Sequence, residues 1–302
     1  MKKANKTSGM IAMGIVVFIY GISYLSRGVV GNYLGTPAIL AFQMGIMTLF
    51  FGIYNIALHR SFKVRKKDLM WIIASGLFGT TFFHGFTILS VNSLGATVSS
   101  LLFGFAAAFA LIIEVIIFNR KKTTLGFVSI IISLLGIYIL MDMNFSDLAS
   151  TNFMGYLLGF GSVVSWVIYT FLCDKISTEY SKSVVLNYQA MVGVLTTVPF
   201  VLASPVTLKT LAIPEVWVNL LILGLFNSSI AYFLNMYAIK QIGVTLSNLF
   251  LNFLPVVTML VSIVLYHTIP GVKQIIGGIF ILISVFMLDK DEKNIHSMGC
   301  KG

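Results

Sequence analysis

One acidic side chain, that of Glu114, lies well inside a long apolar stretch of this sequence. An ionisable group in such surroundings is costly unless it faces a cavity or a partner. Its carboxyl group is therefore a candidate site for a proton or for a cationic amine. The alternative is structural, because Glu114 lies only about one and a half helical turns before Arg120 and would pair there if it reached that basic edge.

Two glutamines, Gln43 and Gln189, stand at comparable places in two other apolar stretches. A primary amide both donates and accepts hydrogen bonds, which suits a zwitterion or another polar solute. The alternative is a hydrogen bond between helices, worth about 0.6 kcal/mol on average in membranes. His84 and Tyr232 form a second such pair, and a lone histidine is more often a packing residue than a proton carrier.

Four aromatic residues stand at equivalent depths in two further stretches: Tyr20, Tyr24, Trp166 and Tyr169. Their ring faces can hold an organic cation by cation–π attraction, worth about 2 kcal/mol when the cation is desolvated. Aromatic residues also form belts at membrane interfaces, but Tyr20 and Trp166 lie too deep for a belt. We therefore expect the group to line a cavity.

Three asparagines, Asn235, Asn248 and Asn252, make a third polar group. Asn248 and Asn252 are four residues apart, which places them on one face of a helix. Pro255 frees one backbone carbonyl a turn earlier. The pattern predicts a polar patch beside a local bend.

Composition indicates which elements must hold these residues. Of the 302 residues, 58% are hydrophobic and 10% are charged, whereas soluble domains carry about 25% charged residues. The net charge of +10 does not indicate nucleic acid, because the basic residues cluster between apolar runs, as in loops at an anionic membrane surface. No Cys/His cluster has metal-ligand spacing. We expect an integral membrane protein with no cofactor and no metal.

Ten stretches are long and apolar enough to cross a bilayer as helices, since each crossing needs about 20 residues. Their apolar runs are continuous rather than alternating, which argues against a barrel. If the N-terminus is cytoplasmic, 17 Lys and Arg fall inside and three, Arg27, Lys209 and Lys273, fall outside. This asymmetry predicts cytoplasmic termini in the inner (plasma) membrane. The predicted spans are 9–27, 36–58, 70–90, 96–118, 123–142, 153–173, 184–203, 215–238, 246–266 and 271–288.

An internal repeat relates the two halves of the chain. A shift of 148 residues gives eight identities without a gap, beginning with Gly76-Leu77-Phe78 on Gly224-Leu225-Phe226. A shift of 146 residues aligns the earlier spans and places Gln43 on Gln189. Such self-similarity indicates a repeated structural unit. The remaining identities pair Gly95 with Gly243, Thr97 with Thr245, Ser99 with Ser247, Leu101 with Leu249 and Phe105 with Phe253.

Each repeat holds five spans, and this odd number makes the second repeat enter the membrane upside down. The predicted fold is therefore an all-α integral membrane protein whose ten transmembrane helices form two inverted five-helix repeats, 1–148 and 149–290, before a cytoplasmic tail, 291–302. Inverted repeats place a solute site between the halves near the midplane, and rocking gives access to it. The symmetry also predicts that Gln43 and Gln189, like His84 and Tyr232, line two vestibules in opposite halves of the membrane.

Five short motifs, in this order, resemble the EamA-type ten-helix members of the drug/metabolite transporter superfamily. They are Tyr20-Gly21-Ile22-Ser23-Tyr24, Gly76-Leu77-Phe78-Gly79-Thr80, Val91-Asn92-Ser93-Leu94-Gly95-Ala96, Phe253-Leu254-Pro255 and Gly277-Gly278. The resemblance covers nearly the whole chain. It implies solute export, commonly of amino acids, amines or metabolites.

Three departures limit what the resemblance transfers. The family often has proline in both the fourth and the ninth span, but here Ala107 aligns with Pro255. Glutamate often ends those spans, where this chain has Arg120 and Thr268, and the usual arginine of the second span lies near where this chain has Gln43. No carboxylate or guanidinium role is therefore transferred to these positions.

The sequence thus favours a secondary transporter that exports small polar metabolites such as amino acids or amines. The expected partners are a small-molecule solute and the lipid bilayer, with protons as a candidate coupling ion, no nucleic acid, and a monomer or homodimer as the assembly. A lipid or bulky-drug translocator of the same fold is an alternative. A membrane scaffold or sensor would not need inverted symmetry, and an enzyme is not expected because no metal, paired-Asp, Ser–His or nucleotide-binding motif appears.

Overall fold

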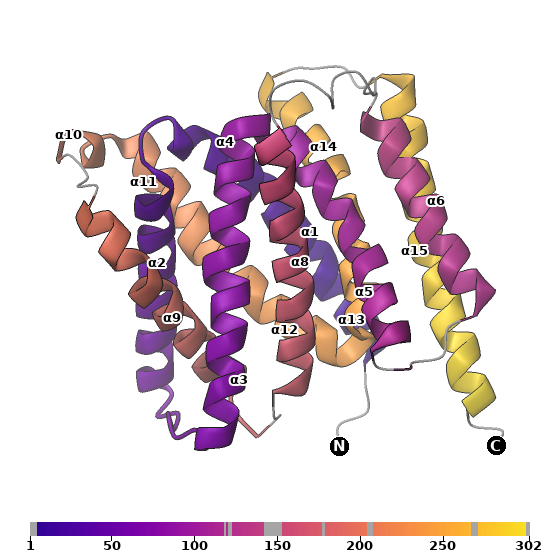
Figure 1. The fold of residues 1–302 in the computed structure, drawn as a ribbon, viewed down its shortest axis with the longest axis horizontal. Helices are drawn as coiled ribbons and strands as arrows, with labels where there is room; N and C mark the ends of the chain where they lie inside the picture. Colours follow the sequence, from indigo (N-terminus) through magenta and orange to yellow (C-terminus); the bar gives the residue numbers. More distant parts are fainter. Residues whose placement is uncertain are drawn as a thin grey trace.

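The computed structural model describes residues 5–117, 119, 123–141, 153–176, 179–203, 208–266 and 271–299, which form a bundle of helices without strands (Figure 1). The first half contains α1 (Lys6–Gly31), α2 (Thr36–Ala57), α3 (Lys66–Gly76), the π-helix η1 (Leu77–Phe82), α4 (Phe83–Leu102), the 3-10 helix η2 (Phe103–Phe105), α5 (Ala106–Ile116) and α6 (Thr124–Met141). The second half contains α8 (Phe153–Lys175), α9 (Lys182–Ala203), α10 (Leu208–Leu211), α11 (Pro214–Leu221), the π-helix η3 (Ile222–Ala231), α12 (Tyr232–Ile242), α13 (Val244–Phe250), the 3-10 helix η4 (Leu251–Phe253), α14 (Leu254–Tyr266) and α15 (Val272–Gly299).

The predicted spans are present as helices. Seven helices of the described chain are long and apolar enough to cross a membrane, and three shorter apolar helices lie at Thr124–Ile139, Val244–Phe253 and Ile275–Leu288. Several elements are longer than predicted. α1 runs over Lys6–Gly31 rather than 9–27, and the third span runs over Lys66–Ala96 rather than 70–90. α15, predicted to span 271–288, continues as a helix to Gly299.

Irregular backbone segments recur in the two halves at the spacing of the repeat. Gly95 has φ 82° and ψ 165°, and Gly243 has φ 80° and ψ 170°, a conformation that only glycine adopts readily. Each glycine is preceded by a π-helix, η1 or η3, and followed by a 3-10 helix, η2 or η4. The 3-10 helix η4 lies before Pro255, and the 3-10 helix η2 forms before the aligned Ala107. The proline is therefore not needed to form a 3-10 helix at this place.

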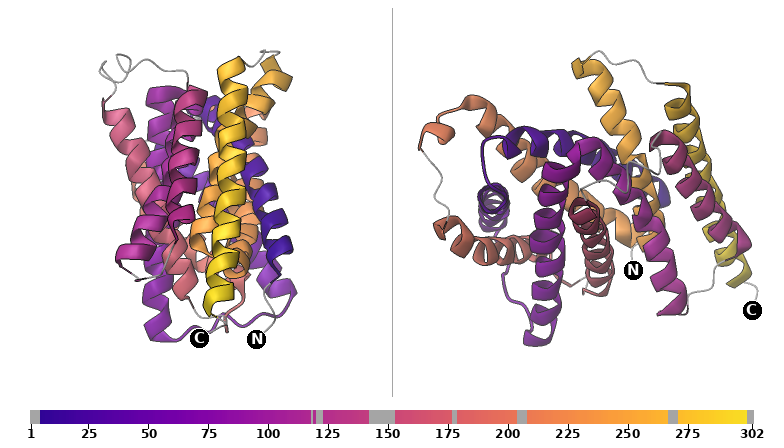
Figure 2. Two further views of the ribbon diagram at one scale, coloured as in Figure 1. Left: turned by 90° about the vertical axis from the view of Figure 1, so that its right-hand side faces the viewer. Right: turned by 45° about the horizontal axis from the view of Figure 1, so that its top comes forward.

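The two repeats run in opposite directions through the bundle. α8 begins at the top of Figure 1 and ends at the bottom, at the edge where α1 begins and α15 ends (Figures 1 and 2). We call this edge the terminus side. The fold is therefore an all-α membrane protein of two inverted five-helix repeats, as predicted.

The repeats interlock rather than stand side by side. α2 packs on α9, α4 on α8, and α1 on α12, so each of these contacts joins one repeat to the other. Close approach depends on a small residue: a Cβ atom at Gly79 would lie 2.2 Å from Cδ2 of Tyr169. α6 and α15 pair with each other at the right-hand edge of Figure 1. The interface between the repeats is thus the core of the molecule, and buried polar residues are concentrated there.

Candidate functional site

A buried chain of hydrogen bonds runs from α1 to α12 through the interface between the repeats. Arg27 donates from Nη1 to Ser23 Oγ over 3.0 Å and from Nη2 to His84 Nδ1 over 3.1 Å. His84 Nε2 lies 2.9 Å from Tyr232 Oη, and Tyr232 Oη lies 2.5 Å from the Gly79 carbonyl oxygen. The side chains of Arg27, Ser23, His84 and Tyr232 are at most 1% exposed. The chain therefore connects both repeats out of contact with solvent.

The two ends of this chain fix the positions of its protons. A guanidinium only donates, so His84 Nδ1 accepts from Arg27 and carries no proton. A carbonyl oxygen only accepts, so the Tyr232 hydroxyl donates to Gly79 and accepts from Nε2–H of His84. His84 is thus a neutral imidazole that transmits a directional chain from a charged donor to a backbone carbonyl. Gly79 lies in η1, and π-helical segments are frequent at functional sites.

The two glutamines have related but unequal surroundings. Gln43 Nε2 donates to Ser228 Oγ over 2.6 Å and lies 3.4 Å from His84 Nδ1, so Gln43 joins the central chain. Gln189 Nε2 donates to Ser75 Oγ over 2.7 Å and lies 3.7 Å from Cys173 Sγ. Shifting Arg27 by the 146 residues of the repeat gives Cys173. A guanidinium beside Gln43 therefore corresponds to a thiol beside Gln189.

The predicted aromatic group is present and buried. Tyr20 and Trp166, which the repeat makes equivalent, meet edge to face with ring centroids 5.7 Å apart. Trp166 lies 5.2 Å from Tyr169 and 5.6 Å from Tyr232, centroid to centroid. Tyr24 faces a cation that belongs to the protein, because the Arg27 guanidinium carbon lies 5.2 Å from its ring centroid. A simple organic cation at Tyr24 would therefore meet a like charge.

The asparagines do not form the single patch that their spacing predicts. Asn248 faces α8, where its Oδ1 accepts from Trp166 Nε1 over 3.0 Å and its Nδ2 lies 3.3 Å from Thr170 Oγ1. Asn252 instead donates to Ser133 of α6. The prediction of a shared face is wrong because Asn252 lies in η4, where the tighter 3-10 winding changes the direction of the side chain. Asn235 is 1% exposed on α12, and the described residues offer its Nδ2 no hydrogen-bond partner.

Glu114 lies away from this hydrogen-bond chain. It is 2% exposed near the end of α5, a helix that packs on α13. Within the described residues, the hydrogen bonds of the central chain come from α1, α2, α4, η1, η3 and α12, and α5 supplies none of them. Arg120, the expected partner in the structural alternative, lies outside the described residues.

Arg27 is the residue whose placement the sequence misjudged. Its position at the end of the predicted span 9–27 assigned it to an outer loop, but α1 continues to Gly31 and Arg27 is buried within the helix. The spacing of Tyr20, Tyr24 and Arg27, at four and then three residues, places all three on one helix face. This spacing was the one signal in the sequence that pointed Arg27 inward with the aromatic residues.

Contacts outside the spans also join the repeats. On the terminus side, Arg65 Nε donates to Asp68 Oδ2 over 2.8 Å and to Tyr180 Oη over 3.1 Å. The hydrogen bond to Asp68, with a further one to Tyr180, raises the pKa of the Arg65 guanidinium. On the opposite side, Tyr33 Oη donates to Glu215 Oε2 over 3.0 Å, and this bond raises the pKa of the tyrosine. A movement that opens either side has to break one of these groups of contacts.

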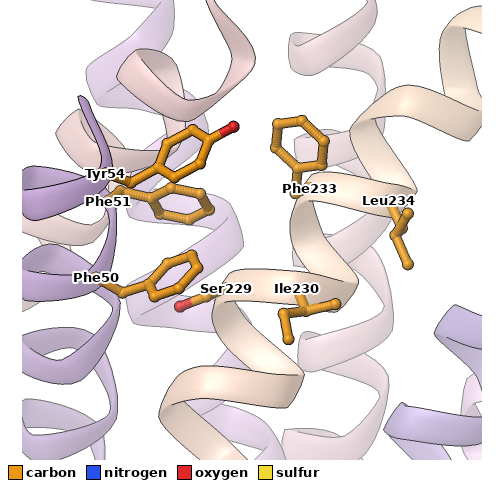
Figure 3. A pocket seen from close by; sticks show the side chains of 7 residues that line it. All are labelled: Phe50, Phe51, Tyr54, Ser229, Ile230, Phe233 and Leu234. Carbon is orange, nitrogen blue, oxygen red and sulfur yellow. The ribbon is translucent and has the colours of Figure 1, made fainter. Parts of the chain in front are cut away.

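An apolar pocket of about 170 Å³ lies between α2 and the η3–α12 segment. Figure 3 shows the α2 rings facing side chains of the opposite segment across it. Thr81 and Thr196 occupy the positions equivalent to Ser229 and Phe50 of this pocket, and their Oγ1 atoms lie 2.7 Å apart. Two threonine hydroxyls thus join η1 to α9, whereas the equivalent contact between η3 and α2 is an apolar recess. The residues that line the recess are Phe50, Phe51, Tyr54, Ser229, Ile230, Phe233 and Leu234.

Comparison with known proteins supports these observations. The model of the EamA-like transporter family matches residues 7–142 and again 153–288. A protein of Archaeoglobus fulgidus described as an uncharacterized transporter is 22% identical over 92% of this chain and 97% of its own length. The uncharacterized transporter YyaM of Bacillus subtilis is 23% identical over 91% of both chains. A protein of known crystal structure has the same fold, with a TM-score of 0.77 and 15% identity over 94% of this chain and 96% of its own.

The family match thus falls twice on the chain, once on each inverted repeat. The family and the relatives are described as transporters, which are not enzymes. Transport by this fold implies a small-molecule solute and a lipid bilayer as partners. The chain belongs to the EamA-like transporter family and is a multi-pass membrane transporter.

Proposed function

We propose that this transporter exports small polar metabolites, such as amino acids or amines, by alternating access between its two inverted repeats. The observation that supports this most directly is the contact between His84 and Tyr232, 2.9 Å apart at equivalent positions of the repeats. Polar side chains from both halves meet there, and solute sites of inverted-repeat transporters lie at such an interface near the midplane. Gln43, Tyr20 and Trp166 adjoin the same contact and supply an amide and aromatic faces.

The central groups are buried, so a solute reaches them only when the repeats separate on one side. Opening the terminus side requires Arg65 to leave Tyr180, and opening the opposite side requires Tyr33 to leave Glu215. Each contact joins one repeat to the other, so rocking of the repeats breaks one while keeping the other. Alternating access in this molecule would thus consist of breaking the contacts on one side while those on the other side remain.

The direction in the membrane is proposed from charge. Arg60, Lys63, Arg65, Lys66 and Lys67 lie between the end of α2 and the first turn of α3, on the terminus side, and this basic cluster supports a cytoplasmic terminus side in the plasma membrane. The sequence has no nucleotide-binding loop, so ATP does not drive transport directly, and the candidates are a proton gradient, solute exchange and simple facilitation. Glu114 is the candidate proton-binding group, and Gln43, Gln189, His84, Tyr232 and the aromatic group are the candidate solute contacts.

Counterflow in proteoliposomes tests the proposal. Purified protein is reconstituted and loaded with unlabelled amino acids, polyamines or quaternary amines, and uptake of the matching labelled solute is measured with and without a pH gradient. Saturable counterflow of one class supports the proposal and identifies the solute type. Protein with a normal elution profile that moves none of these solutes would contradict it.

A second candidate, translocation of lipids or bulky drugs, is favoured by one observation. The recess between α2 and η3–α12 is lined almost wholly by apolar and aromatic groups, and it lies within spanning helices. An acyl chain or a large apolar ring fits such a surface better than a polar metabolite does. Ile230→Trp would fill the recess, so it should slow flipping of a fluorescent phospholipid if lipid is the cargo. It should leave counterflow of a small metabolite nearly unchanged if the central site is the one used.

A further inference from the structure

The guanidinium of Arg27 is buried among groups that carry no opposite charge. Its hydrogen-bond partners are the Ser23 hydroxyl and the neutral His84 ring, and the ring of Tyr24 lies 5.2 Å from its carbon. The ionisable groups of the described chain that interact with it include the phenols of Tyr24, Tyr232 and Tyr20 and the imidazole of His84. No carboxylate of the described residues approaches it, although Arg27 is only 1% exposed.

A charge held in this way is expensive, because hydroxyls and rings replace only part of the hydration that it loses. Charged residues that persist inside membrane proteins usually face a partner or a transported species. Two of the five N–H groups of the guanidinium donate to Ser23 and His84, and Nε has no partner among the described residues. Arginine therefore retains donors for a planar, two-oxygen anion.

Acceptors for the other end of a zwitterion lie close by. Gln43 Oε1 is buried without a hydrogen-bond partner in the described chain, and so is the hydroxyl of Tyr24. The Gln43 amide reaches the same His84 nitrogen that Arg27 contacts. One guanidinium balances one negative charge, which favours a carboxylate over a doubly charged phosphate ester.

We propose, on the basis of the function proposed above, that Arg27 binds the carboxylate of the transported solute. The solute is then an amino acid or another organic carboxylate rather than an amine. The repeat does not duplicate this site, because the position equivalent to Arg27 holds Cys173. The aromatic group packs against the apolar part of the solute. Because Arg27 lies over the ring of Tyr24, a free amine at that ring would meet a like charge.

Matched solutes test this without any mutation. Counterflow by the wild-type protein is measured for leucine and phenylalanine, and for the amines that lack only the carboxylate, isopentylamine and phenethylamine, with glycerol phosphate as a further probe. We expect counterflow of a carboxylate and at least about tenfold less for its amine, because a charge-assisted hydrogen bond supplies that much discrimination. The thermal stability of the detergent-solubilised protein should rise with the same carboxylate and not with its amine.

Variants of Arg27 provide the second arm. Arg27→Gln should lower carboxylate counterflow at least about tenfold. Arg27→Lys should retain part of the counterflow, since lysine keeps the positive charge but lacks the planar guanidinium that donates two parallel hydrogen bonds to a carboxylate. Arg60→Gln removes an exposed arginine that bonds Ser181 and serves as the matched control. Elution of each variant as a single symmetric peak establishes that it is folded.

The outcomes separate the inference from the proposal on which it rests. Saturable counterflow of amines in preference to carboxylates, or carboxylate counterflow unchanged in Arg27→Gln, would overturn the role of Arg27 but leave a small-solute transporter. Preference for glycerol phosphate would overturn the carboxylate assignment. Failure of every carboxylate in the panel, from folded wild-type protein, would overturn the inference together with the proposed solute class.

Discussion

His84 Nε2 lies 2.9 Å from Tyr232 Oη, and these residues occupy equivalent positions in the two repeats. Two equivalent residues of an inverted pair touch only if both lie on the pseudo-twofold axis that relates the halves. The contact therefore locates that axis. The sequence predicted that His84 and Tyr232 line two separate vestibules, whereas here they touch each other. A rotation of one repeat against the other must either take place around this hydrogen bond or break it.

Removing the Tyr232 hydroxyl should reduce transport and lower stability. Tyr232→Phe leaves the Gly79 carbonyl and His84 Nε2–H without their partner, and a buried unsatisfied group costs about 1–3 kcal/mol. A double-mutant cycle with His84→Phe, measured by thermal unfolding, should give a favourable coupling energy of about 1 kcal/mol. Tyr188→Phe is the control, since it removes a hydroxyl that donates to the Phe62 carbonyl far from the axis. Additive effects at His84 and Tyr232 would mean that their contact contributes nothing.

Replacing Glu114 tests whether its carboxyl group binds the coupling ion. If it does, Glu114→Gln should abolish the dependence of counterflow on a pH gradient while exchange without a gradient continues. Asp174→Asn, which alters a carboxylate that pairs with Lys240 within the second repeat, is the control. Normal transport by Glu114→Gln at every pH and gradient would make Glu114 a structural residue.

The two glycines with positive φ should resist substitution for reasons of backbone conformation alone. No neighbouring atom lies within 4 Å of a Cβ built on Gly95 or Gly243, so the cost of alanine comes from φ values of 82° and 80°. We expect each substitution to cost about 1–3 kcal/mol and to lower the thermal midpoint. Gly14→Ala and Gly45→Ala also meet nothing within 4 Å, but they lie in regular helix and should be neutral or slightly stabilising. Similar losses at all four sites would contradict this explanation.

Labelling of Cys173 should report opening of the terminus side. The thiol is 2% exposed and lines a pocket of about 50 Å³ with Lys240 and Tyr180. In a Cys300→Ser background, N-ethylmaleimide should react slowly, and a transported solute should change the rate severalfold by shifting the balance of conformations. Ser61→Cys, introduced into a chain without Cys173 and Cys300, gives the rate for an exposed thiol. Equal rates for Cys173 and that reference, without solute, would contradict the closed arrangement.

The helices and their inverted order could largely be predicted from the sequence. Apolar length alone located the spans, because a bilayer leaves the backbone no partner except its own helix. The identities between Gly76 and Phe105 and their counterparts predicted a repeat, and the repeat predicted inversion. Gln43 and the aromatic residues Tyr20 and Trp166 are buried in the structure, and their predicted contact with a solute stays a prediction.

The arrangement within the site needed the tertiary structure. Hydropathy placed Arg27 at the end of a span, and only the extension of α1 to Gly31 and the packing of α4 against it turned the guanidinium towards His84. The spacing of Asn248 and Asn252 predicted one face, but the 3-10 turn at Leu251–Phe253 directs them to different helices.

By itself, then, the sequence determined the approximate positions and the inverted order of the helices, because these depend on the transfer of each segment into lipid and on the backbone hydrogen bonds within it. The tertiary structure decided which polar groups meet. A residue's depth along its helix follows from its position in the chain, but its distance from the axis between the repeats depends on how all the helices pack. The packing of the helices places His84 beside Tyr232 and Arg27 beside His84. Glu114, on α5, lies outside this hydrogen-bond chain.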